Sequence, residues 1–225
     1  MEKVPEFVST LFILTTFITL HLFSRATYPK PRGVLPFLLA WLALQGFMAS
    51  SGFYTVTDTF PPRFLLGILP PLAFIFLLFL SPRGRLFIDR LDLKMLTLLH
   101  VIRIPVELVL FWLFSYKTIP QLMTFEGRNF DILSGISALL VYYFGFIKKS
   151  LDRKFILVWN FICLTLLANI VINAFLSAPF PFQKFAFDQP NIAILYFPFV
   201  WLPTLVVPLV LFSHLVAIRK LWKKD

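Results

Sequence analysis

Cysteine is almost absent from this sequence of 225 residues, in which Cys163 stands alone. One cysteine cannot form an intramolecular disulfide, and it excludes any metal site built on several cysteines. Cys163 lies in an apolar stretch, where we interpret it as a small buried hydrophobic residue. Glycine is also scarce, with 8 residues against 29 phenylalanines, which excludes a fibrous or a disordered chain.

Charged residues are few, and those of negative sign are the fewest. Only 14% of the residues are charged, with 11 acidic against 21 basic, while 59% are hydrophobic and 18% aromatic. The mean hydropathy is +0.84. A soluble domain normally keeps its apolar content near ~45–50%, because it cannot hide more apolar surface from water. Lipid can solvate that surface, so the composition predicts a multi-pass membrane protein.

The N-terminal segment lacks the features of a cleaved secretory signal. Lys3 is flanked by Glu2 and Glu6, so there is no net positive region before the first apolar run. Arg25, rather than a small-residue cleavage site, follows that run. We therefore interpret the segment as the first retained helix.

Apolar segments long enough to cross a bilayer recur along the whole chain. A spanning helix needs roughly 20 mostly apolar residues. The sequence predicts an all-α integral membrane protein, a seven-transmembrane-helix bundle that forms a single domain over residues 1–225. The predicted spans are residues 6–24, 34–54, 64–80, 93–116, 132–147, 155–177 and 192–217.

The basic residues divide unequally between the two sides of this topology. One side would hold Arg25, Lys30, Arg32, Arg83, Arg85, Arg90, Lys94, Lys148, Lys149, Arg153, Lys154, Arg219, Lys220, Lys223 and Lys224; the other would hold Lys3, Arg63, Lys117, Arg128 and Lys184. Because cytoplasmic loops are enriched in lysine and arginine, this division predicts an outside N-terminus and a cytoplasmic C-terminus, in the plasma or cytoplasmic membrane. The net charge of +10 then reflects topology and attraction to the lipid bilayer, and no nucleic-acid partner is expected.

The fourth predicted span carries polar residues on one face. At 100° per residue, Arg103 and Glu107 lie within 60° of His100, and Pro105 stands between the two charged residues. The i, i+4 spacing predicts an ion pair between Arg103 and Glu107. Ionisable residues inside a membrane favour a binding role, whereas the alternative is an ion pair that locks the helix against its neighbours. Proline removes a backbone donor, so a bend is expected at this site.

The three histidines of the chain fall at a similar depth on three different spans. His21, His100 and His214 lie roughly 6–9 Å from the predicted cytoplasmic boundary, taking 1.5 Å per residue from the nearest basic residue. Three imidazoles can hold zinc with one open position, and two can ligate a haem. The competing interpretation is three unconnected histidines at similar depth.

Other polar residues complete the set of candidate binding residues. Some lie inside predicted spans and some in the outer loop before the fifth span; they are Gln45, Asn169, Asn173, Glu126, Arg128 and Asp131. Asp131 or Asn129 is also placed to cap the helix that follows. The competing interpretations are hydrogen bonds between helices for the amides and local ion pairs for the loop.

Three functions remain open at this level. The first is a carrier or sensor that binds a small molecule, lipid or ion in a polar intramembrane pocket around the fourth span. The second is an intramembrane metal- or haem-dependent enzyme that uses the three histidines. The third is a structural or accessory membrane subunit. The sequence has no HExxH or GxSxG motif and no lysine in the seventh span for a retinal Schiff base.

Overall fold

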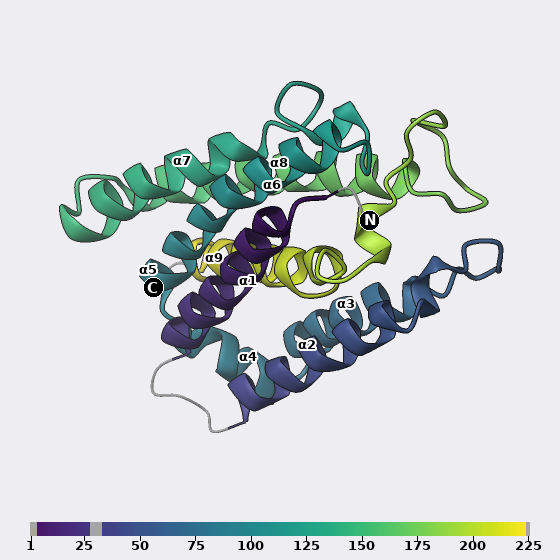
Figure 1. Ribbon diagram of the computed structural model, residues 1–225. Coiled ribbons are helices and arrows are strands. Elements are labelled where there is room, and N and C mark those ends of the chain that lie inside the picture. Colours follow the sequence, from purple (N-terminus) through teal and green to yellow (C-terminus); the bar gives the residue numbers. More distant parts are fainter. Residues whose placement is uncertain (1–3, 28–32, 224–225) are drawn as a thin grey trace.

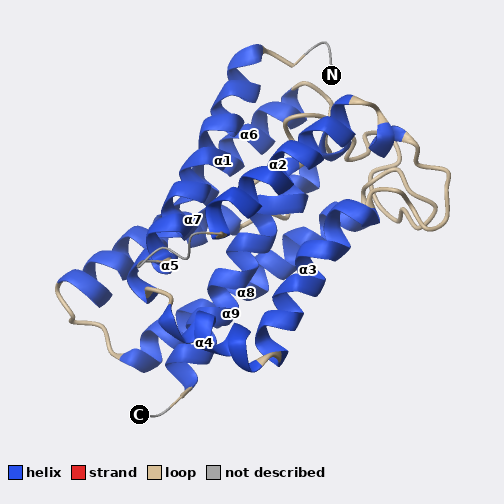
Figure 2. Cartoon of the chain, turned by 90° about the horizontal axis from the view of Figure 1, so that it is seen from below, coloured by secondary structure: helices blue, strands red, loops and turns tan. Residues whose placement is uncertain are grey.

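The computed structural model describes residues 4–27 and 33–223, and every regular element in these ranges is helical (Figures 1 and 2). The α-helices are α1 (Glu6–Ala26), α2 (Val34–Ser50), α3 (Leu65–Leu80), α4 (Pro82–Arg90), α5 (Leu93–Leu99), α6 (Arg103–Ser115), α7 (Asp131–Val141), α8 (Arg153–Leu176) and α9 (Val207–Trp222). Short 3-10 turns cover Phe53–Thr55, His100–Ile102, Gln121–Met123 and Ala193–Leu195, and π-helical turns cover Tyr142–Ile147 and Leu202–Val206.

Length and composition make these helices suited to a bilayer. Within the described ranges, four stretches are long and apolar enough to cross a membrane: Glu6–Ala26, Leu93–Ser115, Arg153–Leu176 and Leu202–Trp222. α3 and α4 pass the same test only as a pair, and they meet at an angle of 94°. α2 and the stretch Asp131–Ile147 are shorter apolar helices. The all-helical architecture of the described residues is as predicted, and the four apolar stretches are compatible with a membrane protein.

Helix bounds agree with the predicted spans within two residues except in two places: α2 ends at Ser50 rather than at residue 54, and the C-terminal helix is shifted. The last span was predicted at residues 192–217, but the helix runs from Leu202 to Trp222. Residues 192–201 form a 3-10 turn and a further turn instead. Pro198 and Pro203 have no amide hydrogen, so they cannot continue a regular helical ladder from Ile192. At the other end, the helix continues through the basic residues that follow Ala217.

The fourth predicted span is continuous but tightened at its centre. α5 passes into α6 through the single 3-10 turn His100–Ile102, and together they form one apolar stretch of 23 residues. Pro105 lies three residues after this turn, and its missing amide leaves the carbonyl of Val101 without the usual i+4 donor. The expected disturbance at Pro105 is therefore a 3-10 turn in the preceding residues.

The helices form a central group with helices on two sides (Figure 1). α1, α5, α6 and α9 lie at the centre, and α7 and α8 pack on one side of them. α2 and α3 lie on the other side, where they contact α1 and α9. α2 and α3 meet each other through Phe37 and Phe74, whose ring centroids are 5.5 Å apart. α9 therefore presents one face to α8 and another to the α2–α3 pair.

A proline and a tryptophan join α2 to α9. Pro208 has no amide to donate to the carbonyl of Thr204, four residues earlier. The indole Nε1 of Trp41 donates to that Thr204 oxygen at 2.9 Å. A backbone group freed by proline thus obtains a partner from a neighbouring helix, as a membrane interior requires.

This arrangement predicts that Trp41 and Pro208 are energetically coupled. Trp41→Phe is expected to lower the free energy of unfolding by about 1–3 kcal/mol, because the Thr204 carbonyl is left without a donor. In a Pro208→Ala background the new amide can bond that carbonyl, so the same change should cost less. A double-mutant cycle of denaturation in detergent measures the coupling. Equal costs in both backgrounds would show that the indole and the proline act independently.

Candidate functional site

A buried network of charged and polar side chains connects α6, α7, α8 and α9. At its centre is Arg103, whose side chain is only 3% exposed. Arg103 Nη1 donates to Asp131 Oδ1 at 2.8 Å and to the carbonyl of Cys163 at 3.4 Å. Arg103 Nη2 lies 3.0 Å from His214 Nε2. One guanidinium thus contacts three other helices, because its rigid fork presents several donors at once.

The hydrogen bonds of His214 define its tautomer. Guanidinium nitrogens only donate, so His214 Nε2 must accept from Arg103. The ring proton then lies on Nδ1, which donates to Asn160 Oδ1 at 2.9 Å. The Asn160 amide nitrogen donates in turn to the carbonyl of Ile156 at 2.8 Å. A continuous chain of hydrogen bonds therefore runs from Asp131 through Arg103 and His214 to α8.

A second branch of the network contains Glu107, one turn after Arg103. Glu107 Oε1 accepts from the Asn129 amide nitrogen at 2.5 Å, and the same nitrogen contacts the carbonyl of Met123 at 3.1 Å. Asn129 Oδ1 accepts from the backbone amide of Asp131 at 3.0 Å. Asn129 therefore links Glu107 to the start of α7 and binds the amide of its first residue, whereas the N-cap position itself is Phe130, without a side-chain capping bond.

Close packing of α6 and α7 brings this network together. Gly135 lies one turn after Asp131, and a Cβ placed on it would be 2.9 Å from Ile104 Cγ1 and 3.1 Å from the Ile104 amide nitrogen. The same Cβ would lie 3.3 Å from Arg103 Cβ. Glycine here lets the two helix backbones approach closely enough for Asp131 to reach Arg103.

The predicted ion pair between Arg103 and Glu107 is wrong. Arg103 pairs with Asp131 of α7, and Glu107 binds the Asn129 amide. Both residues lie on one face of the helix, as the 100° geometry indicates. The guanidinium reaches across to another helix because a carboxylate there satisfies it and joins the two helices.

The three histidines do not meet. His100 and His214 are buried and stack with ring centroids 3.8 Å apart, whereas His21 is exposed on α1. α1 turns a different face, which contains Phe12, towards the core. Both nitrogens of His214 are already hydrogen-bonded. Residues 4–27 and 33–223 contain no group of three or more side chains of histidine, cysteine, aspartate or glutamate suited to a metal ion.

Five of the other candidate binding residues lie outside the network. Gln45 is buried and accepts a hydrogen bond from the Tyr54 hydroxyl at 2.6 Å. The Asn173 amide nitrogen bonds Asn169 Oδ1 at 3.1 Å, four residues earlier on α8. Asn169 in turn donates to the carbonyl of Arg128 at 2.7 Å, while the side chains of Glu126 and Arg128 are exposed. The Asn169–Asn173 bond therefore lies within α8 and the other two amide bonds reach a loop and a 3-10 turn, so none of these bonds is the helix-to-helix bond of the competing interpretation.

Asn160 belongs to the network, although the sequence did not single it out. It is an amide in the middle of an apolar span, which is the same signal that singled out Gln45. The sequence likewise did not single out Ser134, which is buried on α7, or Trp159, whose ring centroid lies 5.7 Å from that of His100. Small hydroxyls and aromatics are too common in membrane helices for their positions to be informative.

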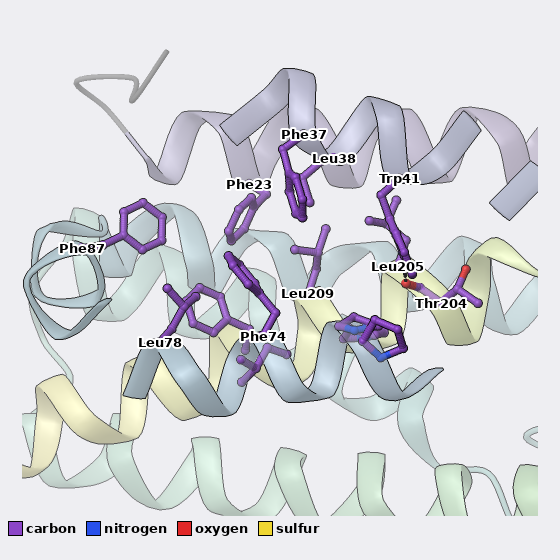
Figure 3. A pocket seen from close by; sticks show the side chains of 15 residues that line it. Phe23, Phe37, Leu38, Trp41, Phe74, Leu78, Phe87, Thr204, Leu205 and Leu209 are labelled. Atoms are coloured by element: carbon purple, nitrogen blue, oxygen red, sulfur yellow. Dashed lines mark hydrogen bonds between the residues drawn. The ribbon is translucent and has the colours of Figure 1, made fainter. Parts of the chain in front are cut away.

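A cavity lies on the opposite side of α9 from the network, and Figure 3 shows its side chains. It has a volume of about 280 Å³ and is lined from α1, α2, α3, α4, α9 and the π-helical turn before α9. Phe37 and Leu38 of α2 face Phe74 of α3, and Leu209 of α9 points between them (Figure 3). The lining is aromatic and aliphatic, and the polar groups near it are those of the Trp41–Thr204 hydrogen bond.

Residues 61–222 match a protein family described as a domain of unknown function, DUF8737. The chain belongs to this family. No curated protein and no solved structure matches it. The part of the chain that matches DUF8737 runs from the residues before α3 to the end of α9, so it contains every member of the charged network. α1 and α2, including Trp41 in the cavity wall, precede the matched residues.

Proposed function

We propose that this DUF8737 protein crosses the membrane seven times, with its N-terminus outside and its C-terminus in the cytoplasm. α2 has 17 residues, which is the lower limit for a spanning helix. α3 counts as a span that ends at the 94° bend, after which α4 lies along the membrane surface. The Asp131–Ile147 stretch is the remaining span. Because it is a shorter apolar helix, it crosses the bilayer with little tilt or where the bilayer thins around it.

Hydrogen bonds at one end of the bundle support this orientation. Arg219 of α9 contacts Asp89 of α4, and Arg153 at the start of α8 donates to the carbonyl of Leu221. The backbone amide of Asp92 donates to the carbonyl of Ala26 at the end of α1. These basic segments therefore share one end, which we assign to the cytoplasm by the excess of lysine and arginine.

We further propose that the protein is a carrier or sensor for a hydrophobic molecule of the lipid class. The observation that carries this proposal is the apolar cavity between the α2–α3 pair and α9. Its volume approaches the ~300 Å³ at which small-molecule sites begin, and its lining would desolvate an acyl chain or a ring system. The residues around the fourth span, by contrast, use most of their polar atoms on one another.

Photolabelling tests this function directly. A sixteen-carbon alcohol that bears a diazirine is added to the protein in detergent, and the labelled peptides are identified by mass spectrometry. Label is expected on α2, α3 and α9 at the cavity lining, and Leu38→Trp should reduce it to under half by filling the space. Leu139→Trp, which lies on an exposed face of α7 away from both hollows, is the matched control and should leave the label unchanged. Label spread evenly over the outer helix faces and insensitive to Leu38→Trp would contradict the proposal.

The unsatisfied atoms of the charged network favour a second candidate, the binding of a small cation. Two buried atoms that can accept a hydrogen bond or bind a cation, His100 Nδ1 and Glu107 Oε2, have no hydrogen-bond partner among the described residues. Buried polar atoms normally have partners, so these two atoms are suited to ordered water or an ion. Sodium ions should then raise the melting temperature relative to N-methylglucamine, and Glu107→Gln should abolish the difference. Equal melting temperatures in both salts would exclude a bound cation.

A further inference from the structure

A second hollow lies between α3 and α9, towards the end of the bundle where the basic segments meet. It is a groove of about 590 Å³. Its sides are apolar and include Leu72, Phe76 and Phe79 of α3 together with Leu215 of α9. Phe76 has 63% of its surface exposed, so the groove opens outward from the bundle.

Cations gather at one end of this groove. Arg219 and Lys223 line it and share one carboxylate: Arg219 Nε lies 3.1 Å from Asp89 Oδ1, and Lys223 Nζ lies 2.9 Å from Asp89 Oδ2. Lys220 Nζ bonds the carbonyl of Leu91 at 2.5 Å. Two cations thus share a single carboxylate, and Lys220 lies beside them on the backbone carbonyls of Asp89 and Leu91, so positive charge remains in excess. The side chains of Arg219 and Lys223 are 23% and 52% exposed, so both remain open to a ligand.

The length of the groove fits one leaflet of a bilayer. Its lining on α9 runs from Leu211 to Lys223, which is about 18 Å at 1.5 Å per residue. Half of the hydrocarbon core is roughly 15 Å thick, so the groove reaches from the headgroup region to near the midplane. Trp222 lies at the cationic end with 68% of its surface exposed, a position typical of the headgroup level.

We propose that the α3–α9 groove binds one anionic phospholipid. Its acyl chain lies along Phe76 and Leu215, and its phosphate binds Arg219 and Lys223 beside the Asp89 carboxylate. Arginine and lysine bind phosphate by charge-assisted hydrogen bonds, and the excess positive charge disfavours a lipid without net charge. This site is separate from the cavity that the diazirine alcohol tests, so the two proposals fail independently.

Native mass spectrometry measures the lipid directly. The whole protein is mixed with equal amounts of phosphatidylglycerol and phosphatidylcholine that carry identical acyl chains, and the bound adducts are counted. The wild type should retain one molecule of phosphatidylglycerol in preference to phosphatidylcholine. Arg219→Gln combined with Lys223→Gln should lower this preference at least fivefold, in line with the gain typical of juxtamembrane basic residues. Lys148→Gln combined with Lys149→Gln removes the same charge outside the groove and should leave the preference unchanged.

Two further variants separate lipid binding from a structural role of the cations. Asp89→Asn frees Arg219 and Lys223, so it should raise the preference for phosphatidylglycerol. Leu215→Trp fills the groove and should remove the retained lipid, whereas Leu38→Trp in the other cavity should not. If the cations only hold α4, Asp89→Asn will lower the melting temperature and leave the ratio of the two lipids unchanged. Equal retention of both lipids by the wild type would likewise overturn the proposal.

Discussion

Asp131→Asn is expected to lower the free energy of unfolding by about 3–5 kcal/mol, because it leaves the Arg103 guanidinium buried without its counter-ion. Glu107→Gln should cost about 1 kcal/mol at most, because glutamine keeps an oxygen that accepts from Asn129. Both changes replace a buried carboxylate by its amide, so they differ mainly in the partner that is lost. Equilibrium denaturation in detergent measures the two costs side by side.

The control for this pair is Glu126→Gln, which neutralises an exposed carboxylate in the loop that leads to α7. It should change stability by less than about 0.5 kcal/mol, as is usual for surface positions. A second variant replaces both Arg103 and Asp131, by methionine and leucine respectively. It should be more stable than Asp131→Asn alone, because removing both charges leaves none uncompensated. If Glu107→Gln lowers the free energy of unfolding more than Asp131→Asn does, Glu107 and not Asp131 is the carboxylate that stabilises the buried Arg103.

Gly135→Ala is expected to destabilise the protein by about 1–3 kcal/mol, the usual cost of overpacking a filled interior. The new methyl group would meet the backbone amide of Ile104, which cannot move aside without moving α6. The separation of α6 and α7 should also stretch the bond between Arg103 and Asp131. Urea or detergent denaturation of the variant measures the loss of stability.

Gly145→Ala provides the matched control. Its methyl group would meet Ile156 Cδ1 at 3.1 Å, the end of a side chain that can adopt another rotamer. Alanine also has a higher helix propensity than glycine, by about 1 kcal/mol, and this gain applies to both variants. Gly145→Ala should therefore be neutral or stabilising. If both glycine variants behave alike, the contact at Gly135 does not hold α6 and α7 together.

The charged stripe could be located from sequence, but its partners could not. The helical periodicity of 3.6 residues places His100, Arg103 and Glu107 on one face, and the structure buries all three. Arg103 pairs with a residue 28 positions away and bonds another 111 positions away. Spacing along one helix says nothing about the rotation of its neighbours, so the nearest carboxylate in sequence was the wrong choice.

The histidines also show that spacing along the chain does not determine which residues of different helices meet. Their distance from the nearest basic residue gives a depth, and two of the three do lie together. Depth leaves the rotation of each helix about its axis undetermined. The exposed face of α1 contains His21 because Phe12 and its neighbours are packed inward instead.

The sequence by itself determined the helical class, the presence and approximate position of apolar helices long enough to cross a membrane, and the helix face that contains His100, Arg103 and Glu107. These follow from composition, from the length of apolar runs and from the period of the helix, all of which are local properties. Only the tertiary structure decided that Asp131 and His214 complete the network, and that the cavity lies on the other side of α9. Both depend on how far apart the helices pack and on which faces they turn to one another, and contacts between distant residues set those quantities.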